Sequence, residues 1–115
     1  VENCNNRMIE LLGLGNFFES ICISTDYPPE KDTYRKPSPK FGLEIIQKYG
    51  INKSNLIYVG DNISDMETAK NIGCMAFGVN YGVYDLRQKM SEREDLNYPI
   101  YDDLYSVGLA ILNYE

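Results

Sequence analysis

Short apolar runs alternate with amphipathic stretches along the chain, and this alternation predicts strands and helices in turn. Apolar runs of strand length, bounded by polar residues or glycine, occur at 20–24, 56–59 and 75–79. Stretches with helical spacing of apolar residues precede or separate these runs, at 6–13, 38–50 and 64–72. Strands joined by helices favour right-handed crossovers, so the pattern predicts an α/β fold with a parallel sheet and flanking helices.

Helix-ending residues support the boundaries of the predicted helices. Ser38 and Pro39 fit an N-cap and a first-turn proline, while Gly50 and Gly73 fit left-handed helix ends. Four apolar residues of the helix at 38–50 are expected to face a core: Phe41, Ile45, Ile46 and Tyr49.

The C-terminal part predicts smaller elements. A helical turn or two is expected at 84–90, followed by a polar loop at 91–97 and a short edge strand at 98–101. Asp102 is the expected N-cap of a final helix that runs to Asn113. Since 115 residues suffice for one domain at most, residues 1–115 are predicted to form a single domain.

Charge and cysteine content exclude several functions. Lys and Arg number 11 against 17 Asp and Glu, which gives a formal net charge of −6 and predicts no nucleic-acid partner. Cys4, Cys22 and Cys74 form neither a paired nor a CxxC pattern, so we expect no disulfide framework and a reducing, cytoplasmic environment. No apolar run approaches the ~20 residues that span a bilayer, so no membrane partner is expected.

Two carboxylates mark the end of the strand predicted at 56–59. Asp61 follows Gly60 directly, and Asp65 comes four residues later, where the next helix should begin. Ligands of parallel α/β sheets bind at the carboxyl ends of strands, and paired carboxylates there suit Mg²⁺ that keeps several waters. A purely structural interpretation makes Asp61 a turn residue and Asp65 an acid favoured by the helix dipole.

A basic pair precedes the helix predicted at 38–50. Arg35 and Lys36 come directly before Pro37, at the end of a polar loop predicted at 25–37. Lysine neutralises phosphate as a mobile point charge, and arginine grips its oxygens through a planar fork. Taken alone, however, the pair is more typical of a solvated surface loop.

Together the two segments resemble the third and fourth sequence motifs of the haloacid dehalogenase superfamily, over about residues 6–104. The resemblance implies a Rossmann-like fold and a Mg²⁺-dependent phosphatase that hydrolyses a phosphorylated small molecule through an aspartyl phosphate. It also implies that Lys36 steadies the nucleophile and the phosphoryl group. Asp61 would bind Mg²⁺, Asp65 would bind it or support a ligand, and Arg35 would contact substrate.

The substrate stays open within this family. The Arg-Lys-Pro sequence is similar to the branch with histidinol-phosphate and heptose-bisphosphate phosphatases, whereas phosphoglycolate-phosphatase-like and nucleotidase-like members also carry Lys-Pro-x-Pro. No cysteine or histidine lies between Cys22 and Arg35, so the zinc site of the first branch is not expected.

The chain departs from the family where the nucleophile should be. It contains no Asp-x-Asp-x-Thr/Val segment, and 1–6 lacks the Ser or Thr of the second motif. We therefore expect this chain alone to be inactive and to be the C-terminal part of the family domain. The alternative is a degenerate, non-catalytic module that binds a phosphorylated ligand or a protein partner. A receiver-like or nucleotide-binding domain is disfavoured because the chain has no Gly-rich phosphate loop.

The family strand order has a further consequence for assembly. In the order five, four, one, two, three, the strands at 20–24, 56–59 and 75–79 would be the third, fourth and fifth. The first and second would be lacking between them, which leaves two unpaired strand edges. We expect these edges to drive a homo-oligomer or a strand-swapped assembly.

Overall fold

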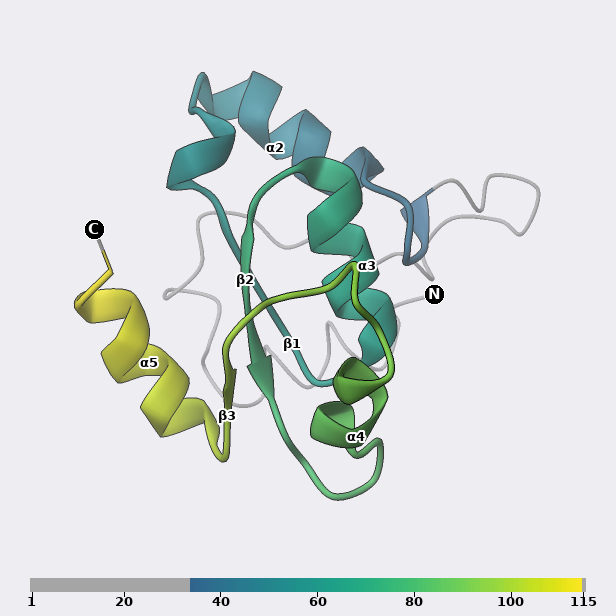
Figure 1. Cartoon of the computed structure of the whole chain (residues 1–115). Coiled ribbons are helices and arrows are strands. Elements are labelled where there is room, and N and C mark those ends of the chain that lie inside the picture. Colours follow the sequence, from purple (N-terminus) through teal and green to yellow (C-terminus); the bar gives the residue numbers. More distant parts are fainter. Residues whose placement is uncertain (1–33, 115) are drawn as a thin grey trace, which may run out of the picture. The chain divides into compact units, whose positions relative to one another are not determined.

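The computed structural model describes residues 34–114 (Figure 1). The chain divides after Arg35 into two units, and the helices and strands described below belong to the second unit, residues 36–115. The helix predicted at 6–13 and the strand predicted at 20–24 lie outside the described residues.

The described part of the chain contains a three-stranded parallel sheet in the order β1-β2-β3 (Figure 1). The strands are β1 (Ile57–Gly60), β2 (Met75–Val79) and β3 (Ile100–Tyr101). Ile57 pairs with Met75, and Gly78 pairs with Ile100. The predicted parallel α/β fold is therefore confirmed, including the pairing of the strands near 56–59 and 75–79.

The helices lie close to their predicted positions. Within 34–114, α2 (Lys40–Tyr49) and the 3₁₀ turn η4 (Lys53–Asn55) precede β1, α3 (Ile63–Ile72) and α4 (Leu86–Ser91) connect the strands, and α5 (Leu104–Leu112) follows β3. Gly50 and Gly73 adopt the left-handed conformation at the ends of α2 and α3, as glycine without a Cβ can at little cost. None of the helices within 34–114 is long and apolar enough to cross a membrane.

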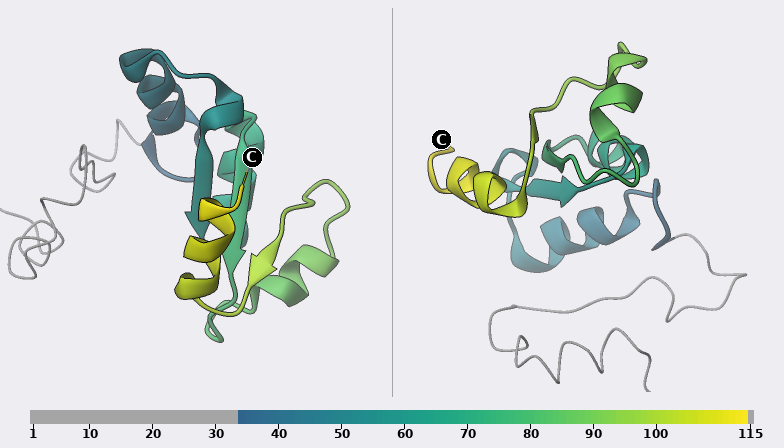
Figure 2. Two further views of the ribbon diagram at one scale, coloured as in Figure 1. Left: turned by 90° about the vertical axis from the view of Figure 1, so that its left-hand side faces the viewer. Right: turned by 90° about the horizontal axis from the view of Figure 1, so that it is seen from below.

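Helices cover the two faces of the sheet unequally (Figures 1 and 2). On one face, α3 and α4 build the larger core, whose buried residues are Met66, Ala69, Ile72, Cys74, Ala76, Leu86, Met90 and Leu96. On the other face, α5 covers a smaller core of Phe77, Val79 and Val107. The turn from β1 into α3 is therefore anchored by the larger of the two cores.

Helix α2 packs on α3 through a glycine. A Cβ on Gly42 would lie 2.3 Å from Cδ1 of Ile72, so the two helices approach more closely than any larger residue would allow. Ile46 packs against the core from the same helix, whereas Tyr49 is 42% exposed. The prediction that Tyr49 faces a core was wrong, because the inward side of α2 is set by Gly42 and Ile46.

Two further expectations need correction. Asp103, not Asp102, is the N-cap of α5, and its side chain accepts a hydrogen bond from the Ser106 N–H at 2.7 Å. Asp102 instead forms an ion pair with Arg87. An apolar run such as 56–59 is typical of a strand buried on both faces of a parallel sheet, but Val59 is 38% exposed, since α5 packs over β2 and β3.

Candidate active site

The turn from β1 into α3 is held by a reciprocal capping arrangement. Asn62 is the N-cap of α3, and its side-chain oxygen accepts from the Ile63 N–H at 2.7 Å. In the other direction, Oδ2 of Asp65 accepts hydrogen bonds from the backbone N–H groups of Asp61 and Asn62, each at 3.1 Å. This capping box satisfies N–H groups that a helix start leaves without partners, so the backbone of Asp61 is fixed in place.

The second oxygen of Asp65 binds the predicted catalytic lysine. Nζ of Lys36 lies 2.7 Å from Oδ1 of Asp65, although the two residues are 29 positions apart in sequence. The Asp65 side chain is 5% exposed and that of Lys36 is 48% exposed. Both carboxylate oxygens of Asp65 therefore have partners within the protein, while Lys36 keeps a surface open to solvent.

Gly60 makes room for this buried carboxylate. A Cβ at position 60 would lie 2.2 Å from Cγ and 2.3 Å from Oδ2 of Asp65. Real Cβ atoms do not approach other heavy atoms so closely, and overpacking of this kind forces neighbouring groups to shift. The Gly-Asp pair at the strand end is therefore explained by the path of the Asp65 side chain.

The local charges keep Lys36 protonated. Partial burial lowers the pKa of Lys36, but the hydrogen bond and the negative charge of Asp65 outweigh burial, so the pKa lies above its ordinary value. Burial raises the pKa of the nearby Tyr58, and the charge of Asp65 raises it further, which keeps the phenol neutral. Lys36 is thus a fixed positive charge at the carboxyl end of β1.

The Asp61 side chain differs from that of Asp65. It is half-buried, and within 34–114 no hydrogen bond or ion pair engages its carboxylate. Its oxygens suit a hard cation such as Mg²⁺, which accepts one or two protein carboxylates and keeps several waters. Within 34–114 no three or more His, Cys, Asp or Glu residues are grouped so that they could hold a metal ion, so these residues do not form a metal site made of protein ligands alone.

The predicted site residues are thus brought together in part. Lys36, Asp61 and Asp65 meet around the end of β1, whereas Arg35 is exposed and belongs to the 1–35 unit. Sequence reasoning missed the N-cap role of Asn62, although an Asn followed three residues later by an acid is a recognisable capping pattern.

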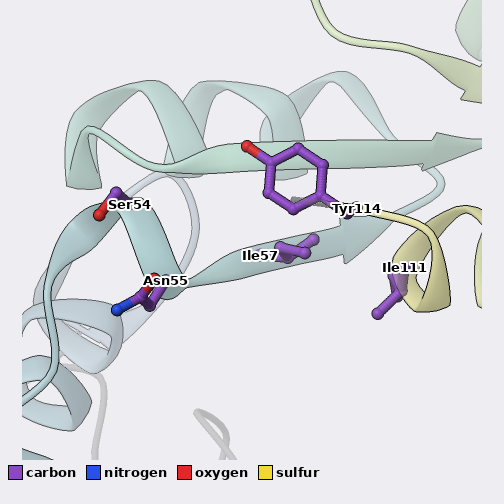
Figure 3. Close-up of a pocket in the computed structure, with 5 residues that line it drawn as sticks. All are labelled: Ser54, Asn55, Ile57, Ile111 and Tyr114. Atoms are coloured by element: carbon purple, nitrogen blue, oxygen red, sulfur yellow. The ribbon is translucent and has the colours of Figure 1, made fainter.

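A pocket elsewhere in the described residues lacks this chemistry. It has a volume of about 240 Å³ and is lined by Ser54, Asn55, Ile57, Ile111 and Tyr114 (Figure 3). The pocket lining does not include Lys36, Asp61 or Asp65. The candidate active site is therefore the turn from β1 into α3, together with Lys36.

Known proteins are similar to this chain in sequence and in fold. The family model of haloacid dehalogenase-like hydrolases matches residues 2–79, which is more than half of the chain. The chain belongs to this family. The match includes Lys36, Asp61 and Asp65, so the haloacid dehalogenase-like resemblance inferred from two short segments is confirmed.

Curated relatives within this haloacid dehalogenase-like family include several phosphoglycolate phosphatases. That of Neisseria meningitidis is 35% identical over 80 residues, which cover 70% of this chain and 32% of the relative. That of Pseudomonas putida is 33% identical over 97 residues, which cover 84% of this chain and 33% of the relative. The chain thus spans about a third of the length of these relatives.

A solved structure supports the fold. The D,D-heptose 1,7-bisphosphate phosphatase of B. bronchiseptica, crystallised with magnesium and phosphate, superposes with a TM-score of 0.62 at 23% identity. The match covers 77% of this chain and 49% of that protein. The haloacid dehalogenase-like fold extends over most of the chain.

Proposed function

We propose that this chain is the C-terminal part of a Mg²⁺-dependent phosphatase that hydrolyses phosphate monoesters of small molecules through an aspartyl phosphate. The observation that carries the proposal is the Lys36–Asp65 ion pair of 2.7 Å beside the backbone-fixed Asp61 at the carboxyl end of β1. Family membership and the phosphatases among the relatives support the same activity.

Lys36 has the charge and exposure that phosphate binding needs. Its ammonium group is held by Asp65, yet 48% of its side chain is exposed. A held cation at this point offsets the negative charge of a phosphoryl group without having to reorganise during the reaction. We assign Lys36 to the phosphoryl group and to the attacking aspartate.

The two acids receive different roles. We assign Asp61 to Mg²⁺, because its carboxylate has no partner among the described residues, and bound Mg²⁺ would neutralise charge on the transferring phosphoryl group. We assign Asp65 to positioning, because its oxygens already bind two backbone N–H groups and Lys36. Of the two predictions for Asp65, metal ligand or support of a ligand, this proposal adopts the second.

The nucleophile belongs to a segment outside these 115 residues. No Asp-x-Asp-x-Thr/Val segment occurs in the chain, and splitting the hydrolysis into two steps requires an attacking carboxylate. We expect the 115-residue chain to show no Mg²⁺-dependent release of phosphate from an aryl phosphate. Release that persists through purification controls would contradict this expectation and assign attack to an acid within the chain.

The net charge of the chain guides the proposed choice of substrate and partners. The formal net charge of −6 disfavours nucleic acid, so a phosphorylated small molecule is the proposed substrate, with Arg35 as an additional substrate contact. The free, buried thiol of Cys74 is compatible with the proposed cytoplasmic location.

The outer edge of β1 is the proposed site of assembly. Within the described residues β1 pairs with β2 on one side and with no strand on the other. An unpaired edge is a template for another strand, either from the rest of the polypeptide or from a second copy. Sedimentation of the 115-residue chain at micromolar concentration distinguishes oligomers from a compact monomer of 13.2 kDa, which would contradict the second-copy proposal.

A non-catalytic module is the second candidate, favoured by the lack of the nucleophile segment. The natural full-length protein separates the two candidates. Turnover of an aryl phosphate that requires Mg²⁺ and falls sharply in the Lys36→Ala variant supports the phosphatase. Absence of turnover, with inorganic phosphate still bound through Lys36, supports the module.

A further inference from the structure

Helix α3 contacts the Lys36 segment at a second point, far from Asp65. Nδ2 of Asn71 donates a hydrogen bond of 2.9 Å to the carbonyl oxygen of Pro37, the residue directly after Lys36. Asn71 lies near the C-terminal end of α3, 34 positions after Pro37 in the sequence. The contact therefore joins two segments that only the fold brings together.

The two contacts hold opposite ends of the lysine arm. Asp65 binds the ammonium group at the start of α3, and Asn71 binds the main chain next to Lys36. Six residues of α-helix rise about 9 Å. The ammonium group of Lys36 and the backbone beside it are therefore held at two separate points of α3.

The surface of α3 between the two contacts is well packed. Asp65, Thr68 and Asn71 follow one another at intervals of three residues, and residues at this spacing are neighbours on a helix surface. Thr68 is 3% exposed, and its hydroxyl donates to the Ser64 carbonyl at 2.7 Å. The first two members of the row are buried and hydrogen-bonded, and Asn71 at its end is exposed.

We propose that Asn71 is a positioning residue that acts on phosphate chemistry through Lys36. The inference rests on the proposed phosphatase function, since it assumes that Lys36 meets the phosphoryl group. Without the Asn71 hydrogen bond, the Pro37 carbonyl loses its direct contact with α3, and the lysine depends on its ion pair with Asp65 and on the packing of α2. Misplacement of a catalytic group by as little as 1 Å lowers turnover by as much as about 100-fold.

The kinetic test uses Asn71→Leu, which keeps the branched shape of the side chain and removes the donor, in the natural full-length protein. Asn113→Leu is the matched control, because Asn113 makes a comparable side-chain bond to the Leu109 carbonyl in α5. With an aryl phosphate and Mg²⁺, we expect kcat of Asn71→Leu to fall about tenfold and that of Asn113→Leu to stay within twofold. In the Lys36→Ala background, Asn71→Leu should cause no further loss, because residues that act as a unit are not additive.

A second measurement does not depend on turnover. Limited acetylation followed by peptide mass analysis compares the modification rate of Lys36 with that of the exposed Lys48 on α2. We expect Asn71→Leu to raise the ratio of Lys36 to Lys48 modification several-fold, because the ammonium group leaves its ion pair more often. Asn113→Leu should leave this ratio unchanged.

The outcomes separate the two ideas. If wild-type protein turns over the substrate and Lys36→Ala is impaired, additive losses in the double variant overturn the role of Asn71 and leave the phosphatase intact. If wild-type protein is inactive or Lys36→Ala is unimpaired, the proposed function fails. The acetylation ratio then decides alone whether Asn71 positions Lys36, and an unchanged ratio rejects that role.

Discussion

The ion pair between Lys36 and Asp65, at 2.7 Å, joins an exposed ammonium group to a buried carboxylate. Desolvating a charge is costly unless it is fully paired, and Asp65 meets this requirement with Lys36 and two backbone N–H groups. One side chain therefore closes the start of α3 and fixes the lysine at the same time. Asp65 thus couples the start of α3 to the position of Lys36, and several predictions use that coupling.

Gly60→Ala should destabilise the protein by about 1–3 kcal/mol, since the new Cβ overlaps with the Asp65 side chain. Denaturant unfolding of the natural full-length protein measures the change. Gly82→Ala is the control, because a Cβ at position 82 meets no atom within 4 Å, and it should alter the free energy of unfolding by only about 0.5 kcal/mol or less. Equal stabilities of the two variants would show that Asp65 moves aside without cost.

Asp65→Asn should lower the free energy of unfolding by about 1–3 kcal/mol, because an amide cannot accept from both N–H groups and from Lys36. Asp102→Asn is a matched surface change, since Asp102 pairs with Arg87 and its side chain is 81% exposed. Exposed ion pairs contribute little, so this control should have a clearly smaller effect. The interpretation of Asp65 as a buried organiser fails if the surface change is the more damaging one.

The capping of α5 by Asp103 should make the stability of the protein depend on pH in the acid range. The backbone N–H of Ser106 holds the pKa of Asp103 below its ordinary value of about 3.9. A lowered pKa means that the native state favours the ionised cap, so its stabilisation is present above about pH 4 and is lost as the pH falls through the lowered pKa. Thermal melting of wild type and Asp103→Asn should therefore differ most near pH 6 and converge towards pH 2. A constant difference across this range would speak against capping by the ionised carboxylate.

The sequence predicted what depends on local pattern. Strand β2 and the Gly73 end of α3 lie where periodicity and the glycine placed them, because a buried strand and a left-handed helix end each have a strong local signal. The cap of α5 was placed one residue early, since adjacent Asp102 and Asp103 offer the same side chain and only the entry angle of the chain selects one. The contact between Asn71 and Pro37 had no local signal, because it depends on how α3 packs on a segment 34 residues away.

The residues of the candidate site were named from the sequence, whereas the different hydrogen bonding of its two acids was not. Lys36, Asp61 and Asp65 were named from two short motifs, and all three belong to the same end of β1. The spacing of Asp61 and Asp65 could not indicate which carboxylate forms hydrogen bonds within the described residues and which does not. That distinction arises from Gly60, whose missing side chain allows Asp65 to turn back towards the backbone.

A Mg²⁺ titration of aryl phosphate turnover, in the natural full-length protein and its Asp61→Asn and Asp65→Asn variants, tests the division of roles most directly. We expect Asp61→Asn to abolish turnover or to shift half-saturation by Mg²⁺ at least about tenfold, as removal of a charged ligand should. Asp65→Asn should lower turnover by about 10–100-fold, as loss of a supporting group does, with little change in Mg²⁺ half-saturation. Wild-type turnover and Mg²⁺ dependence in Asp61→Asn would contradict the account.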